Sequence, residues 1–323
     1  MTLFTLDRRI RCCLIQLYGY LQPTNAEPLS IETLASAIGN ALPSAIVDLQ
    51  ILGNYQTAAE QNNLLATIQA SKYDVIGLSC PQGTYEIAST ALRFIYTSPD
   101  PPHVVLGNAL PTSLPDLFLT DFPHVLIVRG WGETAIVTLC RQIAENCIQL
   151  EAVPSLTYLD TNGVRRDTPI EYTEEPAIPS RIEPTRYFAR VEASRGYHYN
   201  VCTFCSCPPL SKGQPTWRRF DSRVILAQVH QLIEAGITTF TFADEDFLGN
   251  DPEGALDLAQ KMCDFPGLDF ALSVRADNTV NLHGSRDENK LRLRVFQRRR
   301  VSSSVATSAL WERHLARTKY NRH

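Results

Sequence analysis

The chain has 323 residues, of which 44% are hydrophobic, so it can bury a large core, and its length predicts about two domains. Its formal net charge of −4 argues against a nucleic-acid or anionic-membrane partner. The chain has no membrane-spanning apolar run and no signal-peptide pattern, which predicts a cytoplasmic protein. Its nine cysteines at irregular spacing argue against a disulfide framework and for reduced thiols, some of which are candidate metal ligands.

Apolar runs of strand length alternate with helix-length segments along the first half of the chain. Near-continuous apolar strands separated by helices predict a parallel sheet covered on both faces, and therefore an α/β, doubly wound domain over residues 1–150. The expected strands are 11–19, 45–53, 73–81, 103–108 and 124–130, and the expected helices are 31–42, 60–71, 87–98 and 133–145.

Ligands of such sheets lie beyond the carboxyl ends of the strands, where the loops emerge. The sequence therefore predicts binding residues in the loops after four strands. Gly107 and Gly130 each end a strand and allow a sharp turn or a close backbone approach to a ligand, although such glycines can also serve the turn alone. The candidate cofactor-binding residues are Tyr18, Ser79, Gly107, Asn108, Gly130, Gly132 and Glu133.

The stretch VVLGNALPTSLPDLFLTDFPHVLIVRGWGETAI, residues 104–136, resembles the second half of the cobalamin-binding domain found in many radical S-adenosylmethionine enzymes. In that family one strand ends in Leu-Gly-Gly and another in Arg-Gly-Glu-Gly-Glu, so Asn108 and Trp131 are departures. The loop after the first strand has no Asp-x-His-x-x-Gly motif. The resemblance therefore implies cobalamin binding without a histidine ligand to cobalt from that loop.

Residues 151–188 are expected to form a linker. Asn162-Gly163 predicts a hairpin turn between TYLD and VRRD, and the Pro-rich remainder is typical of a connector over the surface. A short strand, RVEAS, follows at residues 190–194.

Residues 195–207 read RGYHYNVCTFCSC, and this stretch resembles the cluster loop of radical S-adenosylmethionine enzymes. Three cysteines of that loop bind three irons of a 4Fe–4S cluster, and S-adenosylmethionine chelates the fourth iron through its amine and carboxylate. The resemblance implies that Cys202 and Cys205 are metal ligands and that Phe204 packs near the adenine. Tyr197 stands where the first cysteine is expected, so the third ligand is His198 or Cys207, or the cluster is defective. A small zinc site or free buried cysteines are the alternatives.

Residues 189–280 are expected to form a partial (β/α) barrel. Helices are predicted at 221–237 and 252–265, and strands at 238–243 and 268–277. Barrel active sites lie at the carboxyl ends of the strands, where Asp244, Glu245 and Arg275 occur. The resemblance implies that the acidic group contacts the amine of S-adenosylmethionine or the substrate, and that Arg275 contacts the carboxylate of S-adenosylmethionine. Alternatively, the acidic residues lie in a solvated loop and Arg275 is a surface residue, or the two loops form an ion pair.

Residues 281–323 form a basic, atypical tail. They contain nine arginines and two lysines against three acids, a net charge of +8, which leaves −12 on residues 1–280. The family resemblance and the apolar periodicity end at the same place. A shifted reading frame is one interpretation, and a natural basic segment that is disordered or binds an anionic partner is the other.

The leading hypothesis is a cobalamin-dependent radical S-adenosylmethionine enzyme with cobalamin, a 4Fe–4S cluster and S-adenosylmethionine as cofactors. The resemblance implies methyl transfer or another radical rearrangement on an unidentified small-molecule or peptide substrate, with electrons from a flavodoxin or ferredoxin. The alternatives are a catalytically inactive remnant that binds only a corrinoid, and a two-domain protein with a structural zinc.

Overall fold

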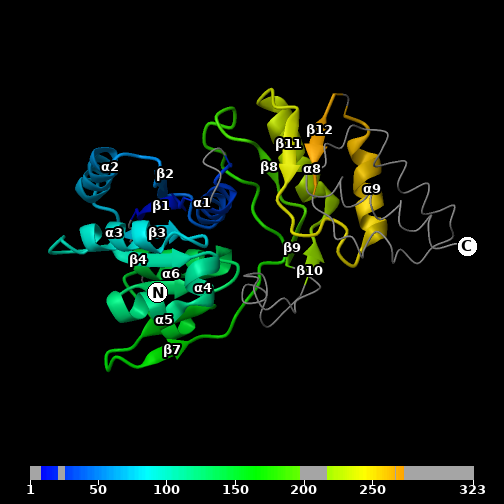
Figure 1. Cartoon of the computed structure of the whole chain (residues 1–323). Helices are drawn as coiled ribbons and strands as arrows, with labels where there is room; N and C mark the ends of the chain where they lie inside the picture. Colours follow the sequence, from blue (N-terminus) through cyan, green and yellow to red (C-terminus); the bar gives the residue numbers. More distant parts are fainter. Residues whose placement is uncertain (1–8, 21–25, 197–216, 266, 273–323) are drawn as a thin grey trace, which may run out of the picture. The chain divides into compact units, whose positions relative to one another are not determined.

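The computed structural model describes residues 9–20, 26–196, 217–265 and 267–272. Two compact units divide the described chain, the first within residues 9–182 and the second within residues 183–272. Figure 1 shows the helices and strands of each unit, coloured by their position in the sequence. No helix among the described residues is long and apolar enough to cross a membrane.

A seven-stranded sheet forms the centre of the first unit, in the order β2-β1-β3-β4-β5-β6-β7. Strands β1 to β5 are parallel, as predicted. Because the chain moves from β1 outward to β2 and then returns to the other side of β1 with β3, the carboxyl ends of β1 and β3 border a topological switch point. The strands are β1 (Arg11–Tyr18), β2 (Ile46–Gly53), β3 (Val75–Ser79), β4 (His103–Gly107), β5 (Leu126–Val128), β6 (Leu156–Leu159) and β7 (Arg165–Asp167).

Helices cover both faces of this sheet. Successive side chains of β1 point to opposite faces, so Cys13 and Ile15 join one buried cluster while Cys12 and Leu14 join the other. The first cluster packs under α2, α3 and α5, and the second under α1 and α6. The helices are α1 (Leu29–Ala41), α2 (Ala58–Ala70), α3 (Tyr85–Ile95), α4 (Ala109–Ser113), α5 (Pro115–Asp121) and α6 (Glu133–Ala144), and a 3-10 turn spans Leu150–Ala152.

The sequence rules that set helix ends are visible at α2. Thr57 accepts a hydrogen bond from the backbone N–H of Glu60, and the Glu60 carboxylate accepts one from the Thr57 N–H. This reciprocal capping box satisfies two backbone donors that a helix start would otherwise leave open.

The expected linker contains part of the sheet, which differs from the prediction. Strand β6 pairs antiparallel with β5, and β7 pairs antiparallel with β6 across the predicted turn at Gly163. Leu156 and Tyr158 alternate along β6 and are buried in the cluster under α1 and α6. The hairpin therefore belongs to the core because its alternating side chains fill one sheet face. Two short helices, α4 and α5, also form between β4 and β5, where the sequence predicts no helix.

The second unit contains the start of a parallel β/α arrangement. A three-stranded parallel sheet runs in the order β12-β11-β8, and helices intervene between successive strands along the chain. In its core the rings of Phe240 and Phe270 stack, and Phe242 meets both of them edge to face. The elements are β8 (Arg190–Val191), β9 (Ser194–Gly196), β10 (Trp217–Arg219), α8 (Ser222–Glu234), β11 (Thr239–Phe242), α9 (Pro252–Met262) and β12 (Asp269–Ala271). The single strand expected at 190–194 is thus two short strands, β8 and β9.

The contribution of the hairpin gives a first testable prediction. A fragment of residues 1–182 should fold, with a cooperative thermal transition by far-ultraviolet circular dichroism. A fragment of residues 1–150 should melt at least about 8 °C lower, because it lacks Leu156, Tyr158 and the other side chains that β6 buries. Equal melting temperatures of the two fragments would contradict this assignment of the hairpin to the core.

Candidate functional site

The carboxyl edge of β1, β3 and β4 brings together polar groups from three neighbouring strands. Gln16 pairs with Ser79 in the register of β1 and β3, and Ser79 pairs with Gly107 in the register of β3 and β4. These three residues therefore lie side by side across the sheet. Parallel pairing of strand ends explains why residues distant in the sequence meet here.

A chain of hydrogen bonds connects this edge to the start of α1. The Ser30 hydroxyl donates to Gln16 Oε1 at 3.0 Å and lies 3.1 Å from the Ser79 hydroxyl, and Asn108 Nδ2 donates to Ser79 Oγ at 3.0 Å. Gln16 and Ser79 are buried, whereas Ser30 is exposed. We call Gln16, Ser30, Ser79 and Asn108 the polar edge. It extends from the sheet interior to solvent and carries hydroxyl and amide groups.

Asn108 has an unusual backbone conformation for a residue with a side chain. Its φ is 78° and its ψ is −171°, a combination that is almost confined to glycine. The Asn108 Oδ1 accepts a hydrogen bond from the Ala109 N–H at 2.6 Å and caps α4. Asparagine at this position thus keeps the turn of a glycine and adds an amide that reaches Ser79.

The loop from Gly130 to Glu133 closes the other end of this edge. Gly130 has a φ of 74°, and its N–H donates to Thr112 Oγ1 at 3.4 Å. Gly132 caps α6, and a Cβ at this position would lie 3.4 Å from Leu34 Cδ2, so the loop packs closely on α1. Glu133 is buried in the first turn of α6, where the helix dipole favours a carboxylate.

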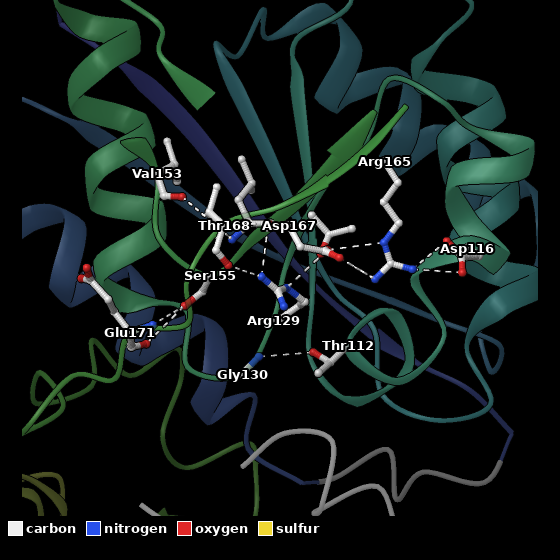
Figure 2. Close-up of polar contacts among 12 residues, drawn as sticks. Thr112, Asp116, Arg129, Gly130, Val153, Ser155, Arg165, Asp167, Thr168 and Glu171 are labelled. Carbon is white, nitrogen blue, oxygen red and sulfur yellow. Dashed lines mark hydrogen bonds and ion pairs between the residues drawn. The ribbon is translucent and has the colours of Figure 1, made fainter. Parts of the chain in front are cut away.

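Arg129 anchors this loop to the β6–β7 hairpin, and this role was missed by the sequence interpretation. Figure 2 shows its guanidinium between the loop and the hairpin. The guanidinium donates hydrogen bonds to the carbonyl oxygens of Leu156, at 3.3 Å, and of Thr168. Its Nε lies 4.0 Å from Asp167 Oδ1. Burial lowers the pKa of Arg129, and the Asp167 charge opposes that shift. The arginine of the Arg-Gly-x-Gly-Glu motif thus positions the loop by holding backbone carbonyls.

A second set of hydrogen bonds continues from Asp167 and Thr168 into the hairpin (Figure 2). The Arg165 guanidinium lies 3.2 Å from Asp167 and 2.9 Å from Asp116 of α5. The Thr168 hydroxyl donates to the Val153 carbonyl at 2.7 Å and accepts from the Leu156 N–H at 2.8 Å. These contacts fix the hairpin on which Arg129 rests.

Tyr18, the first predicted binding residue, is buried, and its hydroxyl donates to the carbonyl of Ala26. This bond joins the end of β1 to the segment that leads into α1. The structure therefore places the Tyr18 side chain inside the first unit, where it supports the edge.

A buried charged cluster lies beside the same segment. Arg181 forms an ion pair with Glu27, and both side chains are almost completely buried. Glu32 Oε1 accepts a hydrogen bond from the Ile182 N–H at 2.6 Å. Burial and the neighbouring Glu27 charge raise the pKa of Glu32 to about 8, against the opposing effects of Ile182 and Arg181. We call Glu27, Glu32 and Arg181 the acid–arginine cluster; it fastens residues 181–182 to α1 and the segment before it.

In the second unit, Asp244 is buried at the carboxyl end of β11. Its carboxylate accepts hydrogen bonds from the Ala193 N–H at 3.1 Å and from the Ser194 hydroxyl. Burial raises its pKa to about 7, although these two hydrogen bonds act in the opposite direction. Glu245 is exposed on the same loop. The structure thus brings Asp244 to the residues that begin β9 and leaves Glu245 in solvent.

The remaining predicted site residues lie outside the described residues. They are Cys202, Cys205, Cys207, His198, Phe204 and Arg275. Within the described part of the chain, no group of three or more histidine, cysteine or acidic side chains is arranged to hold a metal ion.

Comparisons with known proteins agree on the kind of fold. The B12 binding domain family matches residues 28–140. The curated protein 4'-phospho-dehydrooxetanocin synthase of Priestia megaterium is 26% identical over 266 residues, which cover 75% of this chain and 35% of that protein. This chain therefore spans about a third of that relative.

Two solved structures share the fold. OxsB, a cobalamin-dependent S-adenosylmethionine radical enzyme with aqua-cobalamin and S-adenosylmethionine bound, superposes with a TM-score of 0.74 at 23% identity, over 89% of this chain and 42% of OxsB. The radical S-adenosylmethionine methyltransferase TsrM from Kitasatospora setae, with cobalamin and a 4Fe–4S cluster bound, has a TM-score of 0.67 at 14% identity, over 91% of this chain and 66% of TsrM.

Proposed function

We propose that the first unit binds a cobalamin at the carboxyl edge of its sheet. Residues 28–140 match the B12 binding domain family, and the fold is similar to that of two cobalamin-dependent radical enzymes. The observation that carries the proposal is the polar edge, which joins Gln16, Ser79 and Asn108 from three strand ends to Ser30 on α1. It lies beside the switch point between β1 and β3, where sheets of this type bind ligands.

The residues present fit the chemistry of a corrinoid. A cobalamin carries carboxamide side chains around its ring, and neutral amide and hydroxyl groups can act as both donors and acceptors toward them. Gln16, Ser30, Ser79 and Asn108 supply such groups without placing a fixed charge at the edge. Gly130, which follows β5 beside β4, has a positive φ and presents backbone without a side chain.

A bound cobalamin would supply a cobalt centre that can carry a methyl group or change oxidation state. The chain's own residues would bind and orient it. Ser79 contacts both Ser30 and Asn108 in the polar edge, and Arg129 holds the Gly130–Glu133 loop in place. The segment of residues 19–28 between β1 and α1 contains no histidine. We therefore expect no cobalt–histidine bond from that segment.

Asn108 offers a direct test of the polar edge. Asn108→Gly keeps the positive φ and removes the amide that donates to Ser79 and caps α4. It should weaken hydroxocobalamin binding about three- to tenfold, the effect of one hydrogen bond lost to the ligand. Dissociation constants from visible-absorbance titration of the full chain measure this. Asn146→Gly is the matched control, because Asn146 also has positive φ but lies exposed beyond α6. An unchanged affinity in Asn108→Gly would remove Asn108 from the site.

For the whole protein, we propose the activity class of its relatives, a cobalamin-dependent radical S-adenosylmethionine reaction. The support is the sequence similarity to 4'-phospho-dehydrooxetanocin synthase, the SRG and CTFC residues at 194–196 and 202–205, and the parallel β8, β11 and β12 with their intervening helices. In this proposal Cys202 and Cys205, with His198 or Cys207 as the third ligand, would hold an iron–sulfur cluster that binds S-adenosylmethionine, and a flavodoxin or ferredoxin would supply electrons.

Anaerobic reconstitution with iron and sulfide tests this second part. About four irons per chain together with cleavage of S-adenosylmethionine would support it. Corrinoid binding without a cluster would indicate an inactive corrinoid-binding protein, and one zinc per chain would indicate a structural zinc site. Either of these two results would overturn the radical assignment, and the corrinoid result would leave the first proposal intact.

A further inference from the structure

The first turn of α1 contacts both the polar edge and a segment far along the chain. The Ser30 hydroxyl lies 3.0 Å from Gln16 Oε1 and 3.1 Å from the Ser79 hydroxyl. Pro28, the residue before the helix, gives no side-chain hydrogen bond to the helix start, so the capping that often fixes a first turn is missing here. The place of Ser30 in the polar edge therefore depends on tertiary contacts of this turn.

Residues 180–182, which we call the anchor segment, supply such contacts. The Ser180 N–H donates to the Glu32 carbonyl at 3.1 Å, and the Ile182 N–H donates to Glu32 Oε1 at 2.6 Å. The hydroxyls of Ser180 and Ser36 lie 2.8 Å apart. Because Glu32 and Ser36 are one turn apart on the same face of α1, the anchor segment lies along one face of the helix at its start.

A buried ion pair joins the anchor segment to the residues before α1. Arg181 pairs with Glu27, and their side chains are 3% and 1% exposed. The Tyr18 hydroxyl donates to the carbonyl of Ala26 and ties the same stretch to the end of β1. The approach to α1 is therefore held from two directions, by the end of β1 and by the anchor segment.

Glu32 is the titratable group at the centre of these contacts. Its side chain is completely buried, and Oε1 accepts from Ile182, whereas Oε2 has no hydrogen-bond partner among the residues that the structure describes. A buried carboxylate with so few donors is costly, and the neutral acid avoids that cost. Burial and the Glu27 charge accordingly raise the pKa of Glu32 to about 8, against the opposing effects of Ile182 and Arg181.

Ionisation of Glu32 therefore opposes the contacts with the anchor segment. The charges that shift its pKa are those of Glu27 and Arg181; α6 also packs on α1 and carries Glu133 and Arg141. Between the ordinary pKa of 4.5 and about 8, the buried Glu32 keeps a proton that a solvated Glu32 has released. Detachment of the anchor segment from α1 thus becomes easier as the pH rises through this range.

We propose that the anchor segment and the acid–arginine cluster position Ser30 in the polar edge, so that corrinoid binding and the attachment of the anchor segment to α1 strengthen each other. The proposal rests on the proposed cobalamin binding for its consequence, and on the contacts described above for its mechanism. Glu27, Glu32 and Arg181 are positioning residues, because they act on the ligand through the first turn of α1. Coupling of this kind is reciprocal: each event favours the other by the same free energy.

Hydrogen–deuterium exchange of the full chain without corrinoid tests the mechanism. Glu32→Gln removes the titration and keeps an oxygen for the Ile182 N–H, so at about pH 5 it should match the wild type in peptides that contain Ser180 and Ile182. At about pH 8 these peptides should exchange at least about tenfold faster in the wild type than in the variant. Comparison of the two proteins at one pH cancels the chemical exchange rate.

Glu60→Gln is the matched control, because Glu60 is exposed in the first turn of α2. It should exchange like the wild type in the same peptides at both pH values. Equal exchange of the wild type and Glu32→Gln at about pH 8 would overturn the proposal.

Corrinoid affinity tests the consequence. Cyanocobalamin is the probe, because its cyanide ligand does not titrate between about pH 6 and about pH 9, and equilibrium dialysis gives its dissociation constant. In the wild type this constant should rise at least about threefold over that range, whereas in Glu32→Gln it should stay the same. Ser30→Ala should bind more weakly at about pH 6 and show a smaller rise, because it lacks the group that Glu32 positions.

The two measurements separate this proposal from the proposed function on which it rests. If the wild type binds cyanocobalamin equally well at both pH values, or if Glu32→Gln shows the same rise, the positioning role is overturned and cobalamin binding stands. If the wild type binds no cyanocobalamin, cobalamin binding and the positioning role both fail. The exchange rates still decide in that case whether Glu32 holds the anchor segment on α1.

Discussion

Arg181→Met is expected to lower the free energy of unfolding of the first unit by about 3–5 kcal/mol, because it leaves the Glu27 carboxylate buried without its cation. Methionine keeps most of the side-chain volume, so the loss reports the charge more than a cavity. Urea titration of the 1–182 fragment, followed by circular dichroism, measures the change.

Two further variants separate the charge from its surroundings. Arg181→Met with Glu27→Gln should recover at least about half of the loss, because no uncompensated charge remains. Arg166→Met is the matched control, since Arg166 is half exposed and pairs with Asp160 on the surface at 2.6 Å; it should cost less than about 1 kcal/mol. A loss in Arg181→Met as small as that of the control would show that the acid–arginine cluster does not stabilise the fold.

Glu32 is expected to make the first unit less stable as the pH rises. Its folded pKa is about 8, above the ordinary value of 4.5, so between these values the folded state keeps a proton that the unfolded chain has released. The contribution of Glu32 to the free energy of unfolding is therefore greatest below pH 4.5. It falls as the pH rises from 4.5 to about 8 and is constant above that. Each pH unit of the window costs at most about 1.4 kcal/mol.

Glu32→Gln removes this titration and keeps an oxygen that can accept from the Ile182 N–H. The variant should resemble the wild type near pH 5 and exceed its stability by a few kcal/mol at pH 9. Urea titrations of the 1–182 fragment at four pH values between 5 and 9 measure the difference. Parallel pH profiles of the two proteins would show that Glu32 has an ordinary pKa in the folded state.

The regular part of the first unit could be predicted from sequence because its signals are local. Runs such as RCCLIQLYG and YDVIGLSCP are apolar on both faces, which identifies a parallel strand buried between helices. The rule that ligands lie beyond the carboxyl ends of such strands made Ser79 and Asn108 candidate binding residues. Short pieces were harder, because α4 and α5 lie in a stretch with Pro111 and Pro115, which read as loop.

The residues that were missed depend on tertiary contacts. Gln16 lies inside an apolar run and Ser30 in the first turn of α1, so neither stands out until the sheet places them beside Ser79. The sequence indicates Arg129 only as part of an Arg-Gly motif. Its carbonyl partners belong to the hairpin that was predicted as part of the linker. Asp244 lies at a strand end, where a catalytic acid is expected, and only the fold shows that its carboxylate accepts hydrogen bonds from the Ala193 N–H and the Ser194 hydroxyl.

The central claim is that the first unit holds a cobalamin at the carboxyl edge of its sheet. The most direct measurement is hydrogen–deuterium exchange of the full chain, without a reconstituted cluster, in the presence and absence of saturating hydroxocobalamin. Binding of about one corrinoid per chain should slow exchange in the peptides that contain Ser30, Ser79, Asn108 and Gly130. Absence of saturable binding, or protection confined to peptides without these residues, would contradict the claim.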